Sequence, residues 1–365
     1  MAINTGYQVP EKPDTLVTHR ILADSENRLW IFFQTNYRSL AFGTSGDGGA
    51  TWSPAREILP DVSGPFSATF GSGGSVHVVA KRSHPHDIHL LTWNGKTWSK
   101  GLVLPATGKQ LVAGYPMVLE DDKSLLHVLY AVRPYSSGEW QVKHSVVNLA
   151  RQEINPCKSP GISAPLPQWP ERLGFLKEIL FWSGDVTKDT LNNLHLVCRA
   201  FSGSHYQIHY SQCKYGSGEW QGFIPLTRTP FHRGHPKIVT GSGEGVIHVV
   251  FQTEEEKGNC LSCLSRDANG RWNSERVLAE GIEGDFSPEL IKTNWGPVVY
   301  WTGREGVHRA FIESSGVESV LDEKVTGMSA VFAQKKVILA CTGLRKSKNT
   351  IFISVDHVEA LSGKL

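Results

Sequence analysis

Arginines recur at comparable positions along this chain, each following a short apolar segment. They are Arg38, Arg82, Arg133, Arg199, Arg304 and Arg345. A guanidinium group binds a carboxylate through two parallel hydrogen bonds, so this set favours an anionic ligand such as an acidic sugar. Residues that precede neighbouring apolar segments add further side chains, among them Arg20, Tyr115, Glu178, His235 and Asp285.

Two of these residues could perform acid–base chemistry. Paired carboxylates cleave glycosidic bonds, so Glu178 and Asp285 are the expected catalytic residues if the protein is an enzyme. The expected ligand-binding residues are Arg20, Arg82, Tyr115, Arg133, Arg199, His235 and Arg304. The alternative interpretation is that these arginines are solvated or pair with nearby acids.

Histidine is frequent, with fifteen residues, but its placement favours structure over chemistry. Eight histidines occupy two equivalent positions of a repeated segment: His77, His127, His195 and His248 at one, His89, His144, His209 and His308 at the other. Each ring is expected to pack between repeats and to bond a backbone carbonyl. Only the His84-Pro-His86 loop keeps a metal site open as an alternative, and no cofactor is expected.

The repeat itself is a short apolar strand. It occupies residues 29–33, 76–80, 126–130, 194–198, 247–251, 297–301 and 337–341. A preceding strand is expected to begin near His19, Phe66, Tyr115, Lys177, His235, Phe286 and Met328. A third strand is expected at residues 39–44, 88–92, 142–147, 207–212, 260–265, 307–312 and 350–355. In several copies a Gly-rich turn then leads to a fourth strand.

This pattern predicts an all-β fold. Strands in sets of four, with Gly-rich turns, are typical of a β-propeller. Seven antiparallel blades are favoured, with six as the alternative. The prediction is one domain, residues 1–365, with blades near 14–62, 63–110, 111–160, 171–228, 229–280, 281–324 and 325–365. Residues 7–13 could pair with the last blade. Ligands of propellers usually bind at one axial face, which the starts of the first strands and the loops after the second strands would form.

One turn after a third strand is distinctive. Residues 45–52 read Ser-Gly-Asp-Gly-Gly-Ala-Thr-Trp. Ser45 and Asp47 can bond nearby backbone groups, Gly49 can adopt positive φ, and Trp52 can fold back as an apolar plug. A second such turn, one residue off the ideal pattern, contains Ser265, Asp267 and Trp272.

The first octet resembles the Asp-box (BNR-repeat) signature, Ser-x-Asp-x-Gly-x-Thr-Trp, of sialidase-like β-propellers. The resemblance implies a propeller and a glycan-directed activity. Arg20, in Thr-His-Arg-Ile-Leu, matches the arginine of the family's first strand, and Glu178 is a possible counterpart of its glutamate. Residues 34–39 contain no carboxylate where the family has its acid, and no late tyrosine matches its nucleophile. The catalytic motif is therefore only partly matched.

Composition narrows the partners and the cellular location that can be expected. A formal net charge of +2 gives no reason to expect nucleic acid or a membrane surface as partner. The N-terminal residues lack the pattern of a secretory signal, so the expected location is cytoplasmic, unless a signal has been removed. The six cysteines are scattered and are interpreted as ordinary buried thiols.

Two functions remain open. The favoured one is a propeller that binds a carbohydrate or another anionic small ligand on its axial face without a complete sialidase catalytic set. The alternative is a glycoside hydrolase, of exo-sialidase or another type, that acts through carboxylates on that face.

Overall fold

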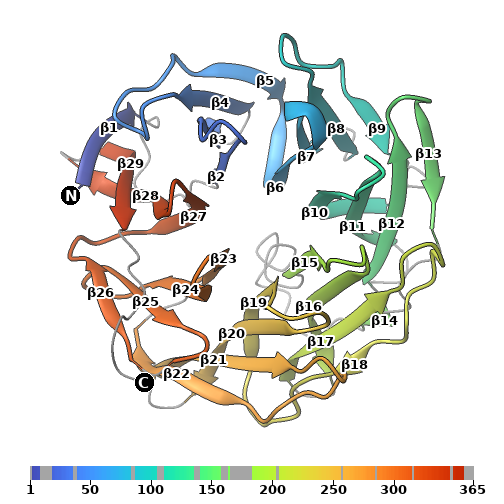
Figure 1. Ribbon diagram of the computed structural model, residues 1–365, viewed down its shortest axis with the longest axis vertical. Helices are drawn as coiled ribbons and strands as arrows, with labels where there is room; N and C mark the ends of the chain where they lie inside the picture. Colours follow the sequence, from blue (N-terminus) through green and yellow to red (C-terminus); the bar gives the residue numbers. More distant parts are fainter. Residues whose placement is uncertain are drawn as a thin grey trace. The chain divides into compact units, whose positions relative to one another are not determined.

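The chain is almost entirely β-strand. The computed structural model describes residues 2–8, 19–35, 39–83, 87–104, 111–134, 140–157, 163–164, 183–202, 205–255, 258–283, 286–314, 316–345 and 348–356. Within these ranges the one helix is a single 3₁₀ turn, η1 (Ser72–Gly74). The strands form seven antiparallel sheets, the blades of a β-propeller (Figure 1).

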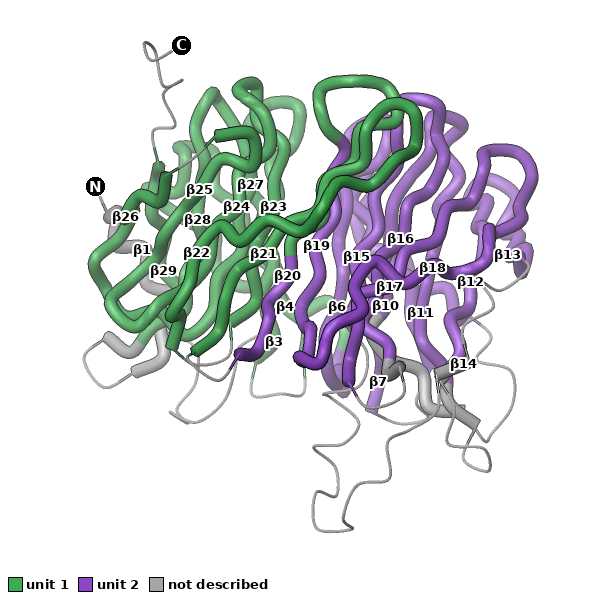
Figure 2. The backbone as a smooth tube through the Cα atoms, turned by 90° about the horizontal axis from the view of Figure 1, so that it is seen from below, with its two compact units in different colours: residues 1–59, 241–250, 257–365 green, residues 60–240, 251–256 purple. Residues whose placement is uncertain are grey.

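The chain divides into two compact units, residues 1–59, 241–250 and 257–365 (unit 1) and residues 60–240 and 251–256 (unit 2) (Figure 2). In unit 1, blade 1 contains β2 (His19–Ala23), β3 (Leu29–Thr35), β4 (Ser39–Ser45) and β5 (Arg56–Pro60). Blade 6 contains β23 (Glu289–Thr293), β24 (Gly296–Thr302), β25 (Val307–Phe311) and β26 (Glu318–Leu321). Blade 7 contains β27 (Gly327–Ala333), β28 (Lys336–Arg345), β29 (Lys348–Asp356) and β1 (Ala2–Gln8).

Unit 2 contains the next three blades. Blade 2 has β6 (Val62–Phe70), β7 (Val76–Arg82), β8 (Ile88–Trp93) and β9 (Leu102–Leu104). Blade 3 has β10 (Leu111–Glu120), β11 (Leu126–Pro134), β12 (Trp140–Asn148), β13 (Glu153–Pro156) and β14 (Ser163–Ala164). Blade 4 has β15 (Gly184–Lys188), β16 (Leu194–Ser202), β17 (His205–Cys213) and β18 (Ile224–Pro225). Blade 5, with β19 (Arg233–Thr240), β20 (Ile247–Glu255), β21 (Gly258–Arg266) and β22 (Arg276–Ile282), has residues in both units.

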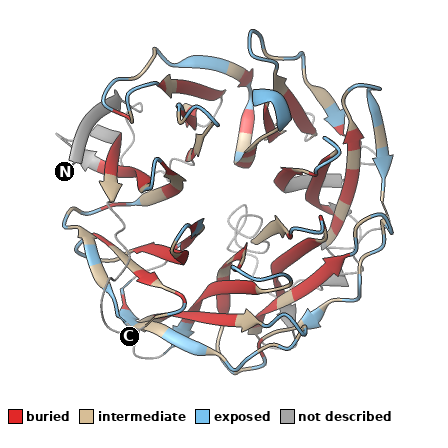
Figure 3. Cartoon of the chain, in the orientation of Figure 1, coloured by how far each residue is buried: buried red, intermediate tan, exposed pale blue. Residues whose placement is uncertain are grey.

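Burial follows the strand order within each blade. The second strands are nearly all buried on both faces, as in β3 and β24 (Figure 3). The fourth strands β5, β13 and β22 carry exposed residues. This explains why the second strands appear in the sequence as continuous apolar runs, and why they marked the repeat.

The seven-bladed prediction is confirmed. Every predicted second strand lies within an observed one, from β3 to β28. In blade 4 the first described strand is β15, which begins at Gly184, and Lys177 lies outside the described residues. Residues 2–8 pair with the last blade, where Ala2 lies opposite Ser354 and Gln8 opposite Thr350. Tyr7 and Gln8 of the predicted segment 7–13 are part of this strand, and residues 9–13 lie outside the described residues. The single domain and its blade boundaries stay predictions.

First strands of successive blades lie side by side within each unit. In unit 2, β6 contacts β10, β10 contacts β15, and β15 contacts β19. In unit 1, β27 contacts both β2 and β23. The start of each first strand therefore lies near the starts of its neighbours, which is the arrangement that brings loop residues from different blades together.

The turn at residues 45–52 is closed by its own side chains. Ser45 Oγ accepts from the Gly49 amide at 2.9 Å, and Asp47 accepts from the Thr51 amide at 2.9 Å and the Thr51 hydroxyl at 2.6 Å. These bonds, that from the Thr51 hydroxyl first, lower the pKa of Asp47 to about 2. Gly49 has φ of +95°, and a Cβ there would lie 3.1 Å from Ile353 of blade 7, so glycine suits both demands.

The same closure recurs in blades 1, 2, 4 and 5. In each, the residue after the turn's tryptophan donates its amide hydrogen to the end of the third strand: Ser53 to Thr44, Ser99 to Thr92, Gln221 to Gln212, and Asn273 to Ser265. Trp52 packs against a cluster that includes Ile351 and Ile353. In the second predicted turn, Asp267 accepts from the Arg271 amide at 2.9 Å, Ser265 instead lies 2.8 Å from His248, and Trp272 bridges to Arg266. These turns connect the third strand to the outer strand in these four blades.

Candidate ligand-binding site

Two neighbouring strands of blade 4 place a cation on an aromatic ring. Arg199 on β16 lies opposite Ile208 on β17, and Tyr206 is two residues from Ile208 on the same face. The Arg199 guanidinium lies 4.0 Å from the centre of the Tyr206 ring. Both residues are buried, at 9% and 3% exposure. Burial raises the pKa of Tyr206 to about 12, although the nearby Arg199 lowers it, so the phenol is protonated at neutral pH.

The connection from β18 to β19 brings His232 to this pair. The Tyr206 amide donates to His232 Nδ1 at 3.2 Å, and the Glu254 amide donates to the His232 carbonyl at 2.9 Å. The Gln207 side chain donates to the carbonyls of Thr229 and Phe231, each at 3.0 Å. The His232 backbone and ring are thus held from two strands.

These contacts fix the role of the His232 ring. Burial lowers its pKa, as do His205 and Arg199, whereas Glu254 acts in the opposite direction. The ring is therefore neutral at pH 7. Because Nδ1 accepts a hydrogen bond, the single ring proton is on Nε2. His232 is then a hydrogen-bond donor through Nε2 and is poorly suited to act as a base.

The start of β19 completes the arrangement. Arg233, at 4% exposure, donates to the Thr253 hydroxyl and lies 5.6 Å from the centre of the Phe251 ring. A Cβ on Gly234 would lie 3.5 Å from Arg199 Nη1, so β19 runs directly past the guanidinium. His235 has φ of +47°, a left-handed conformation that costs a non-glycine residue about 1–3 kcal/mol. Such strain gathers at functional sites.

We call Arg199, Tyr206, His232, Arg233 and His235 the Arg199 cluster. It combines two permanent cations, a neutral histidine donor and an aromatic ring, and all five residues belong to unit 2. This set of groups can hold an anion and the apolar face of a ring. Sequence analysis predicted Arg199 and His235 as ligand-binding residues, and the structure brings their segments together.

A second pairing occurs in unit 1. Arg20, at the start of β2, donates to Glu289, the first residue of β23, at 3.1 Å. The Glu289 side chain is 9% exposed and that of Arg20 is 37% exposed. The strand β27 lies between their strands, so the ion pair joins the first strands of blades 1 and 6. Sequence analysis missed Glu289 because it placed the start of that strand at Phe286.

The other predicted site residues are more dispersed. Arg82 pairs with Asp61 at 3.4 Å and Arg304 pairs with Glu283 at 3.3 Å, as the alternative interpretation of the arginines anticipated. Tyr115 and Arg133 lie on β10 and β11, but their side chains fall outside the described structure. Glu178 and Asp285 lie outside the described residues altogether.

The opposite ends of the blades in unit 2, at the turns between first and second strands, have a different chemistry. Three histidines at the repeated position bond carboxylates through Nε2: His77 to Glu120 at 3.1 Å, His127 to Asp121 at 3.3 Å, and His195 to Asp189 at 3.1 Å. Their Nδ1 atoms bond third-strand side chains, Thr92, His144 and Tyr210. The expected bonds to backbone carbonyls are therefore replaced by side-chain bonds at these positions.

One of these networks has a fixed direction. The Trp220 indole donates to His144 Nδ1 at 3.2 Å, so the His144 proton is on Nε2 and points to His127 Nδ1, 3.0 Å away. His127 Nε2 then donates to Asp121. Burial lowers the pKa of His144 to about 3, which keeps it neutral. The chain from Trp220 to Asp121 ties blade 4 to blade 3.

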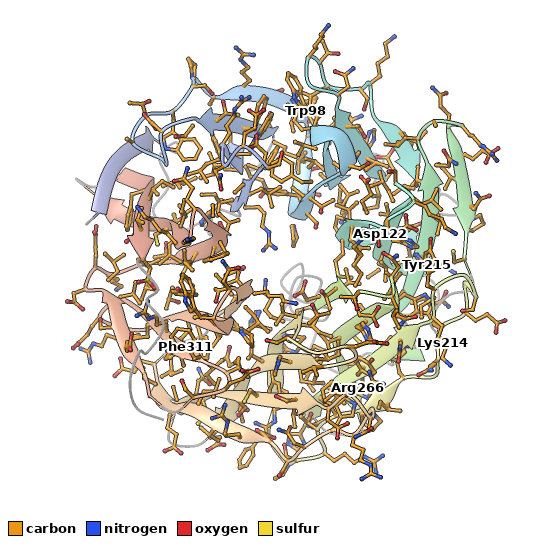
Figure 4. The ribbon with its side chains drawn as sticks, in the orientation of Figure 1. Trp98, Asp122, Lys214, Tyr215, Arg266 and Phe311 are labelled. Atoms are coloured by element: carbon orange, nitrogen blue, oxygen red, sulfur yellow. The ribbon has the colours of Figure 1, made fainter. Side chains whose placement is uncertain are left out.

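Neighbouring turns extend this end of the blades. Asp122 binds Lys188 Nζ at 2.6 Å and Asn192 at 2.9 Å, which joins the turns of blades 3 and 4. Tyr215, labelled with Asp122 in Figure 4, lies 4.9 Å below Lys123. The side chains at this end thus bond one another.

Metal sites, disulfides and membrane-spanning helices are absent from the described residues. No group of three histidine, cysteine, aspartate or glutamate side chains there could hold a metal ion. All six cysteines are free, and five of them are buried. None of the described residues forms a helix of the length and apolarity that a membrane span requires.

Comparisons with known proteins concern the fold. Neither a family model nor a curated protein matches this chain. The solved structure of polysaccharide lyase Uly1 is similar, with a TM-score of 0.60 and 12% identity over 92% of this chain and 89% of the lyase. The GH93 α-L-arabinofuranosidase of Fusarium graminearum has a TM-score of 0.57 and 13% identity over 80% of this chain and 91% of its own. A PL25 ulvan lyase has a TM-score of 0.57 and 7% identity over 97% of this chain and 94% of its own. At such identities the likeness establishes the fold alone.

Proposed function

We propose that this protein binds glycans that carry acidic groups and that the Arg199 cluster is the binding site. The observation that carries the proposal is the Arg199 guanidinium, 4.0 Å from the centre of the Tyr206 ring, beside the donor His232. A guanidinium stacked on a ring keeps its N–H groups in its own plane, where they can meet a carboxylate or sulfate.

The similar structures support a saccharide ligand. They include an arabinofuranosidase and two polysaccharide lyases. One of the lyases is bound to -[GlcA(1-4)Rha3S]-, in which the uronate and the sulfate are both anionic. A ligand of that charge type would match the two arginines and the neutral donor of the Arg199 cluster.

The placement of the cluster at the loop end of its blades supports binding at the axial face. Tyr115 and Arg133, on first and second strands of the preceding blade, would extend such a site. Kinship with Asp-box, sialidase-like propellers is part of the same proposal, and the closed turn at residues 45–52 is its support.

Binding is testable by calorimetric titration of uronate and sulfated oligosaccharides, with neutral oligosaccharides for comparison. Arg199→Gln and His232→Ala are expected to weaken binding of the acidic ligands by about tenfold or more. Arg28→Gln is the matched control, because Arg28 is an exposed arginine that pairs with Glu26 in a hairpin of unit 1, outside the Arg199 cluster. Thermal unfolding verifies that each variant is folded. Acidic ligands that bind the Arg199→Gln and wild-type proteins equally would exclude this site.

A second candidate function is cleavage of a glycosidic bond. The supporting observation is Glu289, a buried carboxylate held by Arg20 at the start of a first strand. Glu178 and Asp285 remain proposed partners for acid–base catalysis. Incubation with arabinan- and ulvan-type oligosaccharides, followed by analysis of reducing ends and of unsaturated products, tests this function. Loss of turnover in Glu289→Gln, with ligand binding retained, would favour it, and binding without turnover of any oligosaccharide would favour a binding protein.

A further inference from the structure

Unit 1 has a pocket of about 370 Å³ at the end of β22 and the turn between β24 and β25. These strands carry labels in Figure 1. Its lining residues belong to unit 1 and are separate from the Arg199 cluster. The volume lies within the range of small-ligand pockets, about 300–1,000 Å³.

The floor and turn of this pocket are shaped by aromatic groups and glycines. Trp301 is almost fully buried, and the His308 ring lies 5.7 Å from it. A Cβ on Gly303 would come within 2.8 Å of His308 Nε2, so glycine there leaves room for the imidazole. The Gly303 amide donates to the Gly306 carbonyl at 2.7 Å, which closes the turn that presents Arg304 and Glu305.

The polar lining mixes donors with acceptors. Arg304, which pairs with Glu283 at 3.3 Å, is a donor, Glu280, Glu283 and Glu305 are acceptors, and the His308 ring has one nitrogen of each kind when neutral. An anion needs donors, and a cation needs acceptors. A hydroxyl group uses both, so this combination matches a polyol best. With three carboxylates and one arginine, the lining also repels the acidic ligands proposed for the Arg199 cluster.

The pocket also has an apolar wall, against which the C–H face of a sugar ring could pack. Ile282 and Val317 border the pocket, and Val317 is 47% exposed. A pyranose or furanose ring presents C–H groups on one face and hydroxyls at its edge, so an apolar wall beside charged rims fits it.

We propose that this pocket is a second carbohydrate site, which binds a neutral sugar residue. It is independent of the function proposed for the Arg199 cluster. A protein with both sites would hold a glycan that contains acidic and neutral residues, or two separate chains.

The test is titration of the full-length protein with methyl glycosides of arabinose, rhamnose and galactose, followed by NMR or calorimetry. Glucuronate and cadaverine serve as the anionic and cationic probes. At least one neutral glycoside is expected to bind with an affinity on the order of millimolar. Glu305→Ala is expected to weaken this binding by about tenfold, and Val317→Trp, which fills an exposed wall, is expected to abolish it.

Glu244→Ala is the matched control, because Glu244 is an exposed glutamate of unit 1 in the turn between β19 and β20. It should bind as the wild type does, as should Arg199→Gln, which tests the other site alone. The proposal is overturned if no neutral glycoside binds, if Val317→Trp binds as well as the wild type, or if cadaverine or glucuronate binds this pocket in preference to all neutral probes.

Discussion

The two ends of the blades in unit 2 use similar polar residues in different ways. At the turns between first and second strands, a histidine bonded on both nitrogens recurs in blades 2, 3 and 4, each time with a carboxylate. At the other end, the Arg199 cluster occurs once among the described residues. A feature that recurs in three successive blades answers a need that these blades share, which is packing, whereas a feature present once points to a ligand.

Substitution of Asp121, at the histidine–carboxylate end of the blades, is expected to have the largest effect on stability. It is 3% exposed and accepts from the amides of Lys123 and Leu125 and from His127. Asp121→Ala is expected to lower the free energy of unfolding by about 2–4 kcal/mol, since it leaves the buried His127 ring and the part-buried amides of Lys123 and Leu125 without their acceptor. Urea denaturation measures the change. The neighbouring Asp122→Ala is the control, because Asp122 is exposed, and equal losses in the two variants would contradict this account.

Lowering the pH is expected to destabilise the histidine–carboxylate end of the blades. Burial lowers the pKa of His77, His127 and His144, and for His144 the value falls from 6.5 to about 3. Below pH 6.5 the unfolded chain takes up protons that these folded rings refuse, so stability decreases as the pH falls and is full above pH 6.5. Urea unfolding at pH 7.5 and pH 5 is expected to show this loss. The loss should be smaller in His144→Gln, and an unchanged pH dependence in that variant would argue against the network.

Arg199→Lys is expected to affect ligand binding strongly and stability only slightly. The lysine keeps the charge but loses the planar fork and most of the stacking on Tyr206. Binding of acidic glycans is expected to weaken by about tenfold, while the free energy of unfolding changes by about 1 kcal/mol. Calorimetry and urea denaturation on the same sample compare the two effects. A large loss of stability with unchanged affinity would place Arg199 among the packing residues.

Arg82→Gln should have the smallest effect. Arg82 pairs with Asp61, whose side chain is 59% exposed, and exposed ion pairs contribute about 0–1 kcal/mol. Thermal unfolding is therefore expected to be nearly unchanged. A measurable decrease in affinity for longer acidic oligosaccharides, but not for short ones, would indicate that the ligand extends from blade 4 towards blade 2.

The sequence was sufficient for the fold because the signal there is repeated. Seven apolar second strands, each covered on both faces, leave a pattern that survives the loss of any one copy. The turn at residues 45–52 could also be predicted from the sequence, since Ser45, Asp47 and Gly49 form hydrogen bonds within the same few residues.

The site was less accessible to sequence reasoning. The contact between Arg199 and Tyr206 depends on strand register, and the proton position of His232 depends on a single amide. Glu289 is recognisable only once the start of β23 is known.

The second-strand histidines are buried, as expected, but their carboxylate partners were missed. Glu120, the partner of His77, comes from another blade and leaves no local pattern. Asp121 and Asp189 lie six residues before His127 and His195, a local spacing that the sequence analysis did not use.

The pairing of β1 with β29 has a consequence for how these molecules meet one another. The last blade takes its outer strand from the opposite end of the chain, through an antiparallel register that runs from Ala2 to Gln8. The bonding edge of β29 recognises backbone, so a β1 strand from another copy satisfies it as well as the molecule's own. At high concentration, or after brief partial unfolding, we expect exchange of this strand to give a swapped dimer in which each last blade is completed by its neighbour.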